Sequence, residues 1–173
     1  MKVLLLNGSP RKNGCTYTAL NVVADALKAE GIDAEVFQAG DPDMENVKAA
    51  AAKLKDSDAL VVGSPVYWAS PSGQIIEFMD RLASVAGKDM LYKPAAAVAS
   101  ARRAGTTATL DVLTKYFSYH QMPVVSSCYW NMVHGNTPEE VMKDEEGVQI
   151  MRVLGKNMAW LLKCIEAGKK NGV

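Results

Sequence analysis

The sequence predicts an α/β domain whose five-stranded parallel sheet, of strand order 2-1-3-4-5, is covered by helices on both faces in a three-layer sandwich. Three observations lead to this prediction. Short apolar runs alternate with longer amphipathic stretches along the chain. Parallel strands need crossover connections, which helices supply, and right-handed crossovers leave few topologies. With 173 residues, the chain fits one domain spanning residues 1–173.

The first half of the chain contains three units of a strand followed by a helix. The expected strands are Lys2–Leu6, Ala34–Phe37 and Ala59–Val62. Each is a short apolar run, and the first and third are closed by Gly with Pro nearby, as expected of buried parallel strands. The expected helices are about Thr16–Glu30, Asn46–Lys55 and about Ser72–Ala86. Their apolar residues recur at helical spacing, and Gly31 supplies a stop for the first helix.

The second half continues the alternation. Pro94–Ala99 is expected to be a fourth strand, because its small residues suit a crowded central position. The remaining expected elements are a helix at Thr107–Phe117, a fifth strand at Pro123–Ser126, a loop carrying Tyr129, Trp130, Asn131 and His134, and a helix at about Glu145–Ala167. The inner stripe of this last helix runs from Val148 to Ile165 at helical spacing.

Composition limits the classes of partner. Lys plus Arg equal Asp plus Glu at 19 each, so the formal net charge is zero and no nucleic-acid partner or membrane anchor is expected. The three cysteines, Cys15, Cys128 and Cys164, form no CxxC pair, and no metal site is expected. The apolar run Val3–Leu6 is too short for a signal-peptide core, which predicts a cytoplasmic protein.

Sheets of this kind bind ligands beyond the carboxyl ends of their strands, near the switch point between the first and third strands. This rule nominates the loops 8–16, 64–71 and 100–106. The first loop suits a phosphate, because it combines two glycines, the hydroxyls of Ser9 and Thr16, and the basic side chains of Arg11 and Lys12 before a helix N-terminus. It carries neither a GxxxxGK[ST] nor a GxGxxG pattern, and the alternative is an ordinary turn capped by Thr16.

Three motifs together resemble the NADPH-dependent FMN reductase family. They are Asn-Gly-Ser-Pro-Arg-Lys-Asn-Gly-x-Thr at 7–16, Gly-Ser-Pro-Val-Tyr-Trp at 63–68 and Gly-Gln-x-x-x-x-Met-Asp-Arg at 73–81. The resemblance covers the first half densely and the second half only by fold pattern. It implies a flavodoxin-like fold, FMN as cofactor, NADPH or NADH as electron donor, and a homodimer or homotetramer. The sequence is most similar to the branch of iron–sulfur flavoproteins, but the stretch Asp41–Lys55 has no cysteine cluster, so a flavin-only relative is expected.

The resemblance also implies cofactor-binding residues at matching positions. The phosphate loop falls on Ser9, Arg11, Asn13, Gly14, Cys15 and Thr16. The isoalloxazine loop falls on Pro65, Val66, Tyr67 and Trp68. The alternative is that the aromatic pair, Tyr67 and Trp68, only packs the mouth of the core. The third loop, a looser match, contributes Ser100, Arg102, Arg103 and Gly105. Either arginine could meet the flavin's polar edge or the 2′-phosphate of NADPH, and the alternative is a solvated pair.

No Ser-His-Asp order, paired carboxylates or metal-ligand cluster stands out, so no catalytic side chain is expected. The leading hypothesis is an FMN-dependent NAD(P)H oxidoreductase that delivers electrons to a small acceptor such as free flavin, a quinone or a similar aromatic. Two alternatives stay open, an electron-transfer protein serving a protein partner and a regulatory flavin-binding module. A carrier is disfavoured by the neutral charge and by Arg102 and Arg103 near the site, since carriers present an acidic docking face.

Overall fold

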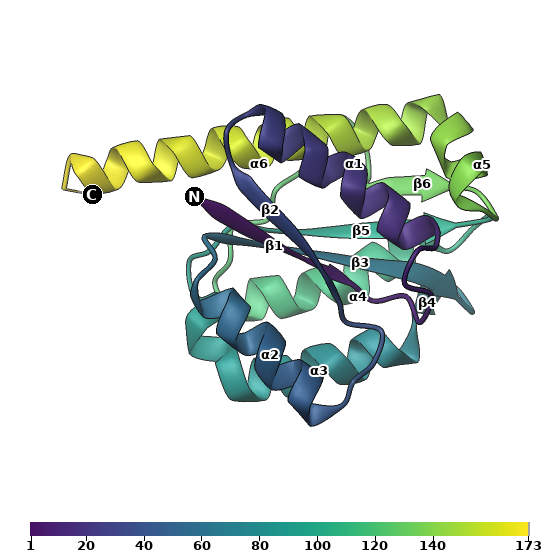
Figure 1. Cartoon of the computed structure of the whole chain (residues 1–173), viewed down its shortest axis with the longest axis horizontal. Helices are drawn as coiled ribbons and strands as arrows, with labels where there is room; N and C mark the ends of the chain where they lie inside the picture. The colour runs from purple at the N-terminus through teal and green to yellow at the C-terminus, as the bar shows by residue number, and fades with distance from the viewer. Residues whose placement is uncertain (173) are drawn as a thin grey trace.

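A central sheet separates two layers of helices in the computed structural model, which describes residues 1–172 (Figure 1). Val173, the last residue of the predicted domain, lies outside the described residues. One face of the sheet is covered by α1 (Cys15–Ala29) and α6 (Glu145–Lys170). The other face is covered by α2 (Met44–Lys55), α3 (Gly73–Met90) and α4 (Thr106–Tyr119).

The parallel strands lie in the order β2-β1-β3-β5-β6, which confirms the predicted order of five strands. Their bounds are β1 Lys2–Asn7, β2 Asp33–Gln38, β3 Ala59–Tyr67, β5 Ala95–Ala101 and β6 Met132–His134. A sixth short strand that the sequence did not predict, β4 (Ser70–Pro71), pairs antiparallel with the end of β3.

Successive side chains of β1 point to opposite faces of the sheet, and both faces are buried. Val3 and Leu5 belong to the core under α1 and α6, whereas Leu4 and Leu6 belong to the core under α2, α3 and α4. All four are fully buried. A strand buried on both faces reads as a continuous apolar run, and this is the pattern that predicted β1 correctly.

The fifth strand is where the sequence prediction was wrong. Pro123–Ser126 forms only an isolated parallel bridge, between Val124 and Ala95, and the chain then leaves the sheet. It returns at β6, which pairs with the end of β5 and lies inside the segment that was expected to be a loop. Val124 is about half exposed whereas Val125 is buried, as expected at the edge of the sheet, but the run does not form the predicted fifth strand.

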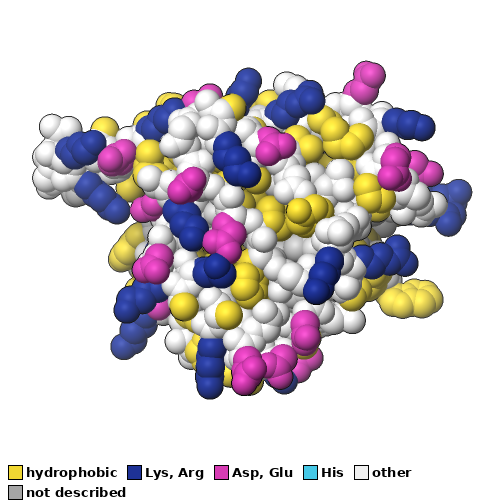
Figure 2. Space-filling view, in the orientation of Figure 1, with side chains coloured by type: hydrophobic (Ala, Val, Ile, Leu, Met, Phe, Trp, Pro, Cys, Tyr) yellow, Lys and Arg dark blue, Asp and Glu magenta, His cyan; other side chains and the backbone are white. Residues whose placement is uncertain are grey.

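The helices match their predicted positions, with two differences. The expected end of the third helix, Ala86, has non-helical dihedral angles, but a further turn continues α3 to Met90. A short helix that the sequence did not predict, α5 (Pro138–Lys143), follows β6. None of the helices in the described part of the chain has the length and apolarity needed to cross a membrane. Lys/Arg and Asp/Glu side chains are interspersed over the face seen in Figure 2.

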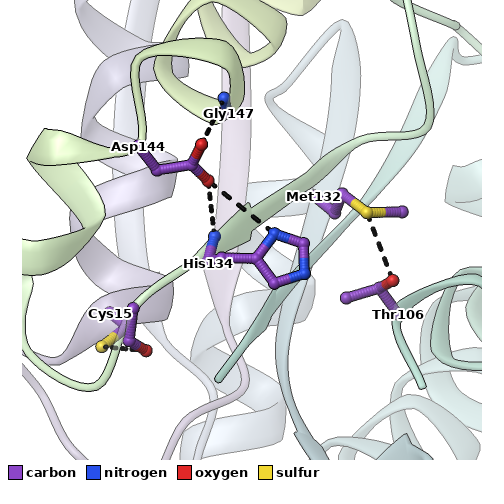
Figure 3. A network of polar contacts seen from close by, with 7 residues as sticks. Cys15, Thr106, Met132, His134, Asp144 and Gly147 are labelled. Carbon is purple, nitrogen blue, oxygen red and sulfur yellow. Dashed lines mark hydrogen bonds and ion pairs between the residues drawn. The ribbon is translucent and has the colours of Figure 1, made fainter. Parts of the chain in front are cut away.

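Asp144 joins the edge strand to the last helix (Figure 3). One carboxylate oxygen accepts the N–H of Gly147 at 3.0 Å and so caps α6. The other accepts the backbone N–H of His134 at 2.7 Å, at the open edge of β6. A carboxylate at a helix N-terminus is favourable both as an acceptor and as a negative charge.

We predict that Asp144→Ala lowers the free energy of unfolding by about 1–3 kcal/mol, because a cap and a strand-edge hydrogen bond are lost together. Glu146→Ala, in the same turn, removes a charge but no cap, and we expect a loss below about 1 kcal/mol. Urea unfolding of the two variants measures the difference. Equal losses would contradict the role given to Asp144.

Candidate functional site

The carboxyl ends of the parallel strands bring the three nominated loops together around one cleft of about 160 Å³. The cleft is lined by Ser9, Arg11, Cys15, Thr16, Pro65, Val66, Tyr67, Ser100, Ala101, Arg102, Gly135 and Asn136. These residues come from the turn before α1 and its first two residues, the end of β3, the end of β5 with the residue after it, and the segment after β6. The cleft therefore lies where doubly wound sheets bind ligands.

Helix α1 begins at this cleft without a side-chain cap. Its N-cap residue is Gly14, and no acidic residue lies in its first turn. By contrast, side chains cap four other helices, namely those of Asp43 on α2, Ser72 on α3, Thr137 on α5 and Asp144 on α6. The free N–H groups of an uncapped first turn, together with the helix dipole, favour an anion.

Helix α4 shares this property, since its N-cap residue is Gly105 and no side chain within residues 1–172 caps it. Gly105 has φ of 100°, a left-handed conformation that favours glycine. A Cβ at this position would lie 2.7 Å from the Cα of Ala69, so a side chain would also clash with the neighbouring turn. Gly105 does not line the cleft, but its lack of a side chain lets the start of α4 approach the turn at Ala69 closely.

Hydrogen bonds hold the first loop in a defined shape. The backbone N–H of Arg11 donates to the hydroxyl of Ser9 at 3.1 Å. The hydroxyls of Thr16 and Ser100 lie 2.7 Å apart and are hydrogen-bonded, which ties the start of α1 to the end of β5. Thr16 thus does not cap α1, so the alternative interpretation of this loop as a turn capped by Thr16 was wrong.

The second loop is a β-hairpin rather than an irregular loop. Val66 pairs with Pro71 and Tyr67 with Ser70, which leaves Trp68 and Ala69 as the two turn residues. Both have positive φ, 53° and 57°, as in a type I′ turn, where Gly and Asn are the favoured residues. The hairpin places Tyr67 in the lining of the cleft and leaves Trp68 fully exposed.

Nine of the fourteen predicted cofactor-binding residues line the cleft. The other five, which the structure places outside its lining, are Asn13, Gly14, Trp68, Arg103 and Gly105. Sequence reasoning missed Ala101, Gly135 and Asn136. Tyr129, Trp130 and His134, for which the sequence left open a place on the substrate side of this subunit or a partner and packing at an interface, do not line this cleft. The Gly135-Asn136 pair directly follows a strand, a signal of a turn at the carboxyl edge that was hidden by misplacing that strand.

Cys15 is the cleft's thiol, and its environment opposes ionisation. Its Sγ lies 3.6 Å from the carbonyl oxygen of Gly135, to which it donates (Figure 3). Partial burial raises the pKa of the Cys15 thiol, and this outweighs the lowering effects of its own backbone N–H and of the nearby Arg11. The neutral thiol form is favoured, which fits a structural member of the loop better than a nucleophile.

Three larger hollows lie elsewhere in the described chain. One of about 550 Å³ lies between α3 and α4 beside Tyr116, and another, of about 720 Å³, lies by Met1 and Pro94 at the amino ends of the strands. The third, of about 310 Å³, is formed by residues 126–130. None of the three contains the start of an uncapped helix. Volume alone therefore does not identify the ligand site, and the smaller cleft has the chemistry that an anionic ligand needs.

A parallel sheet of this order, with a cleft at the carboxyl edge beside its first helix, defines a flavodoxin-like fold. Comparison with solved structures supports the same fold. A flavodoxin from the domain Archaea superposes with a TM-score of 0.72 at 18% identity, covering 94% of this chain and 99% of that one. The chain belongs to the NADPH-dependent FMN reductase family, whose family model matches residues 1–137.

Two curated relatives refine the comparison. An iron–sulfur flavoprotein of Methanocaldococcus jannaschii is 29% identical over 96% of this chain and 100% of its own length. An NADPH azoreductase of a Bacillus species is 30% identical over 58% of this chain and 59% of its own length. The family supports an FMN-dependent oxidoreductase in general terms.

The residues present do not fit an iron–sulfur cluster such as the first relative's name implies. A cluster needs several thiolates that converge on one point. Cys15 is at the start of α1, Cys128 lies between β5 and β6, and Cys164 is on α6. Within residues 1–172, no group of three or more His, Cys, Asp or Glu side chains is placed to hold a metal ion.

We predict that Cys15 reacts with a thiol reagent more slowly than Cys128 at neutral pH. The raised pKa leaves less thiolate at Cys15, and the thiol is partly buried, whereas Cys128 is exposed. Alkylation rates followed by mass spectrometry from pH 7 to about pH 10 test this. The Cys15 rate should still be rising with pH above the ordinary midpoint of a thiol, and a midpoint below it would contradict the account.

Proposed function

We propose that this protein is an FMN-dependent oxidoreductase that accepts electrons from NADPH or NADH and passes them to a small acceptor such as free flavin, a quinone or a similar aromatic. The observation that carries the proposal is the uncapped, acid-free start of α1 beside Arg11 in a cleft at the switch point of the sheet. Family membership supports the flavin, and the name of the azoreductase relative supports NADPH and an aromatic acceptor.

The cleft's first loop fits a phosphate monoester. The N–H groups at the start of α1 offer donors, the guanidinium of Arg11 supplies a charge, and Ser9 and Thr16 supply hydroxyls. Because the first turn of α1 contains no acidic residue, no carboxylate of that turn competes for these donors. The 5′-phosphate of FMN would be held here.

The hairpin side of the cleft fits an aromatic ring system. Pro65, Val66 and Tyr67 form a largely apolar wall, and Tyr67 remains 40% exposed, so its ring has surface available for stacking. Arg102 lines the cleft whereas Arg103 does not, which supports Arg102 as the arginine that meets either the flavin's polar edge or the 2′-phosphate of NADPH.

Bound flavin supplies the redox chemistry, since it accepts hydride from a nicotinamide and passes electrons onward. The chain's own residues bind, orient and screen. None of the cleft-lining residues is Asp, Glu or His, so the described lining offers no carboxylate or imidazole as a general acid or base. This composition suits a reaction in which positioning, rather than proton transfer from the protein, is the protein's contribution.

The visible spectrum tests the proposal. Purified protein is mixed with FMN, desalted, and then treated anaerobically with NADPH. We expect retained flavin absorbance that NADPH bleaches, followed by reoxidation when a quinone is added. Retained absorbance that neither NADPH nor NADH bleaches would contradict the reductase and favour an electron carrier. A protein that retains no flavin would contradict the cofactor assignment itself.

The FMN affinities of two variants, measured from the same flavin absorbance, test where the phosphate binds. Arg11→Ala removes a charge that lines the cleft, and we expect FMN to bind about tenfold more weakly, the effect of losing one charge-assisted hydrogen bond. Lys12→Ala removes a neighbouring exposed charge that does not line the cleft, and we expect less than about a threefold effect on the same scale. Equal effects of the two would show that Arg11 makes no specific contact.

A further inference from the structure

Two side-chain amides, that of the buried Asn7 and that of the partly buried Gln38, contact the phosphate loop without lining the cleft. Asn7, the last residue of β1, is fully buried. Its side-chain amide donates toward the carbonyl oxygens of Arg11 and Lys12, at 3.4 Å and 3.2 Å. Its side-chain oxygen accepts the N–H of Ser9 at 3.2 Å. One side chain thus bonds to three residues of the loop.

Gln38, the last residue of the neighbouring strand β2, completes the network. Its Nε2 donates to the carbonyl oxygen of Ser9 at 2.6 Å, and its Oε1 accepts from Asn7 Nδ2 at 2.8 Å. The chain after β2 also packs tightly against the loop, since a Cβ at Gly40 would lie 2.1 Å from the carbonyl oxygen of Ser9. The loop is therefore held from behind by the ends of two strands.

The chemistry of these bonds determines what the loop presents to the cleft. Three of the loop's carbonyl oxygens, those of Ser9, Arg11 and Lys12, are directed to the two amides. A carbonyl oxygen facing a phosphate would repel it, whereas N–H groups attract it. Neither Asn7 nor Gln38 lines the cleft, so neither contacts a ligand there and both act through the loop.

We propose that Asn7 and Gln38 are positioning residues that preorganise the phosphate loop and thereby determine the preference for a phosphorylated flavin over an unphosphorylated one. The inference rests on the proposed function, because it presumes that a flavin phosphate occupies the loop. A ligand that meets a loop already fixed in its binding conformation does not spend binding free energy on ordering it. Riboflavin shares the ring of FMN but lacks the phosphate, so it does not depend on the loop in this way.

The test compares the dissociation constants of FMN and riboflavin. Gln38→Met keeps the length of a partly buried side chain and removes both of its hydrogen bonds to Ser9 and Asn7. We expect FMN to bind about tenfold more weakly and riboflavin to change by less than about twofold, so that the preference for FMN falls about tenfold. Asn7→Ser, which retains a small polar group, should act in the same direction.

Asn46→Ala is the matched control. Asn46 donates to the backbone oxygens of Gln38 and Asp41, so it removes two hydrogen bonds from the same region without touching the phosphate loop. We expect its preference for FMN to remain within about twofold of wild type, even where its melting temperature falls as far as that of Gln38→Met.

The outcomes separate the inference from the proposed function. If wild-type protein prefers FMN and Gln38→Met retains that preference, the positioning role is refuted while the flavin site stands. If Gln38→Met weakens FMN and riboflavin equally, the amides have only a structural role, and the inference is again refuted. A wild-type protein that binds FMN no more tightly than riboflavin would refute the phosphate site, and with it both statements.

Discussion

The burial of β1 on both faces is the constraint on which the rest of the molecule depends. Because β1 pairs with β2 on one side and β3 on the other, its end at Asn7 lies at the centre of the carboxyl edge. The turn that follows β1 therefore leads from this edge directly into α1, which covers one face of the sheet. This geometry places a helix N-terminus at the switch point, where its free N–H groups and the neighbouring Arg11 favour an anion.

The helices that begin at the site lack the side-chain caps that stabilise the other helices. Within residues 1–172, four helices have side-chain caps, whereas α1 and α4 have none and both begin beside the cleft or its hairpin. Glycines at their N-caps leave the N–H groups free, at a cost in helix stability that capped positions avoid. The Trp68-Ala69 turn at the end of β3 is also strained, since both residues have positive φ, and strained backbone of this kind is common near functional sites.

The sequence predicted the fold well where elements are long and buried, and poorly at the open edge of the sheet. Pro123-Val-Val-Ser has the composition of a strand, but Pro123 carries no N–H, and the chain pairs only at Val124 before leaving the sheet. β6 has only three residues, Met-Val-His, too few to show a period. Misplacing this strand also hid Gly135 and Asn136, and no local pattern could show that Asn7 and Gln38 would meet behind the loop.

The central claim is that the start of α1 holds the phosphate of FMN, and phosphorus NMR of the protein with one equivalent of FMN tests it most directly. A free phosphate monoester loses its second proton at about pH 6, so its phosphorus chemical shift changes between about pH 5 and about pH 8. The account predicts a bound resonance, distinct from that of free FMN, whose position stays constant over this range because the N–H groups and Arg11 hold the dianion. A resonance that follows the titration of free FMN in the presence of bound, optically perturbed flavin would contradict the account, since the ring would then be bound without its phosphate.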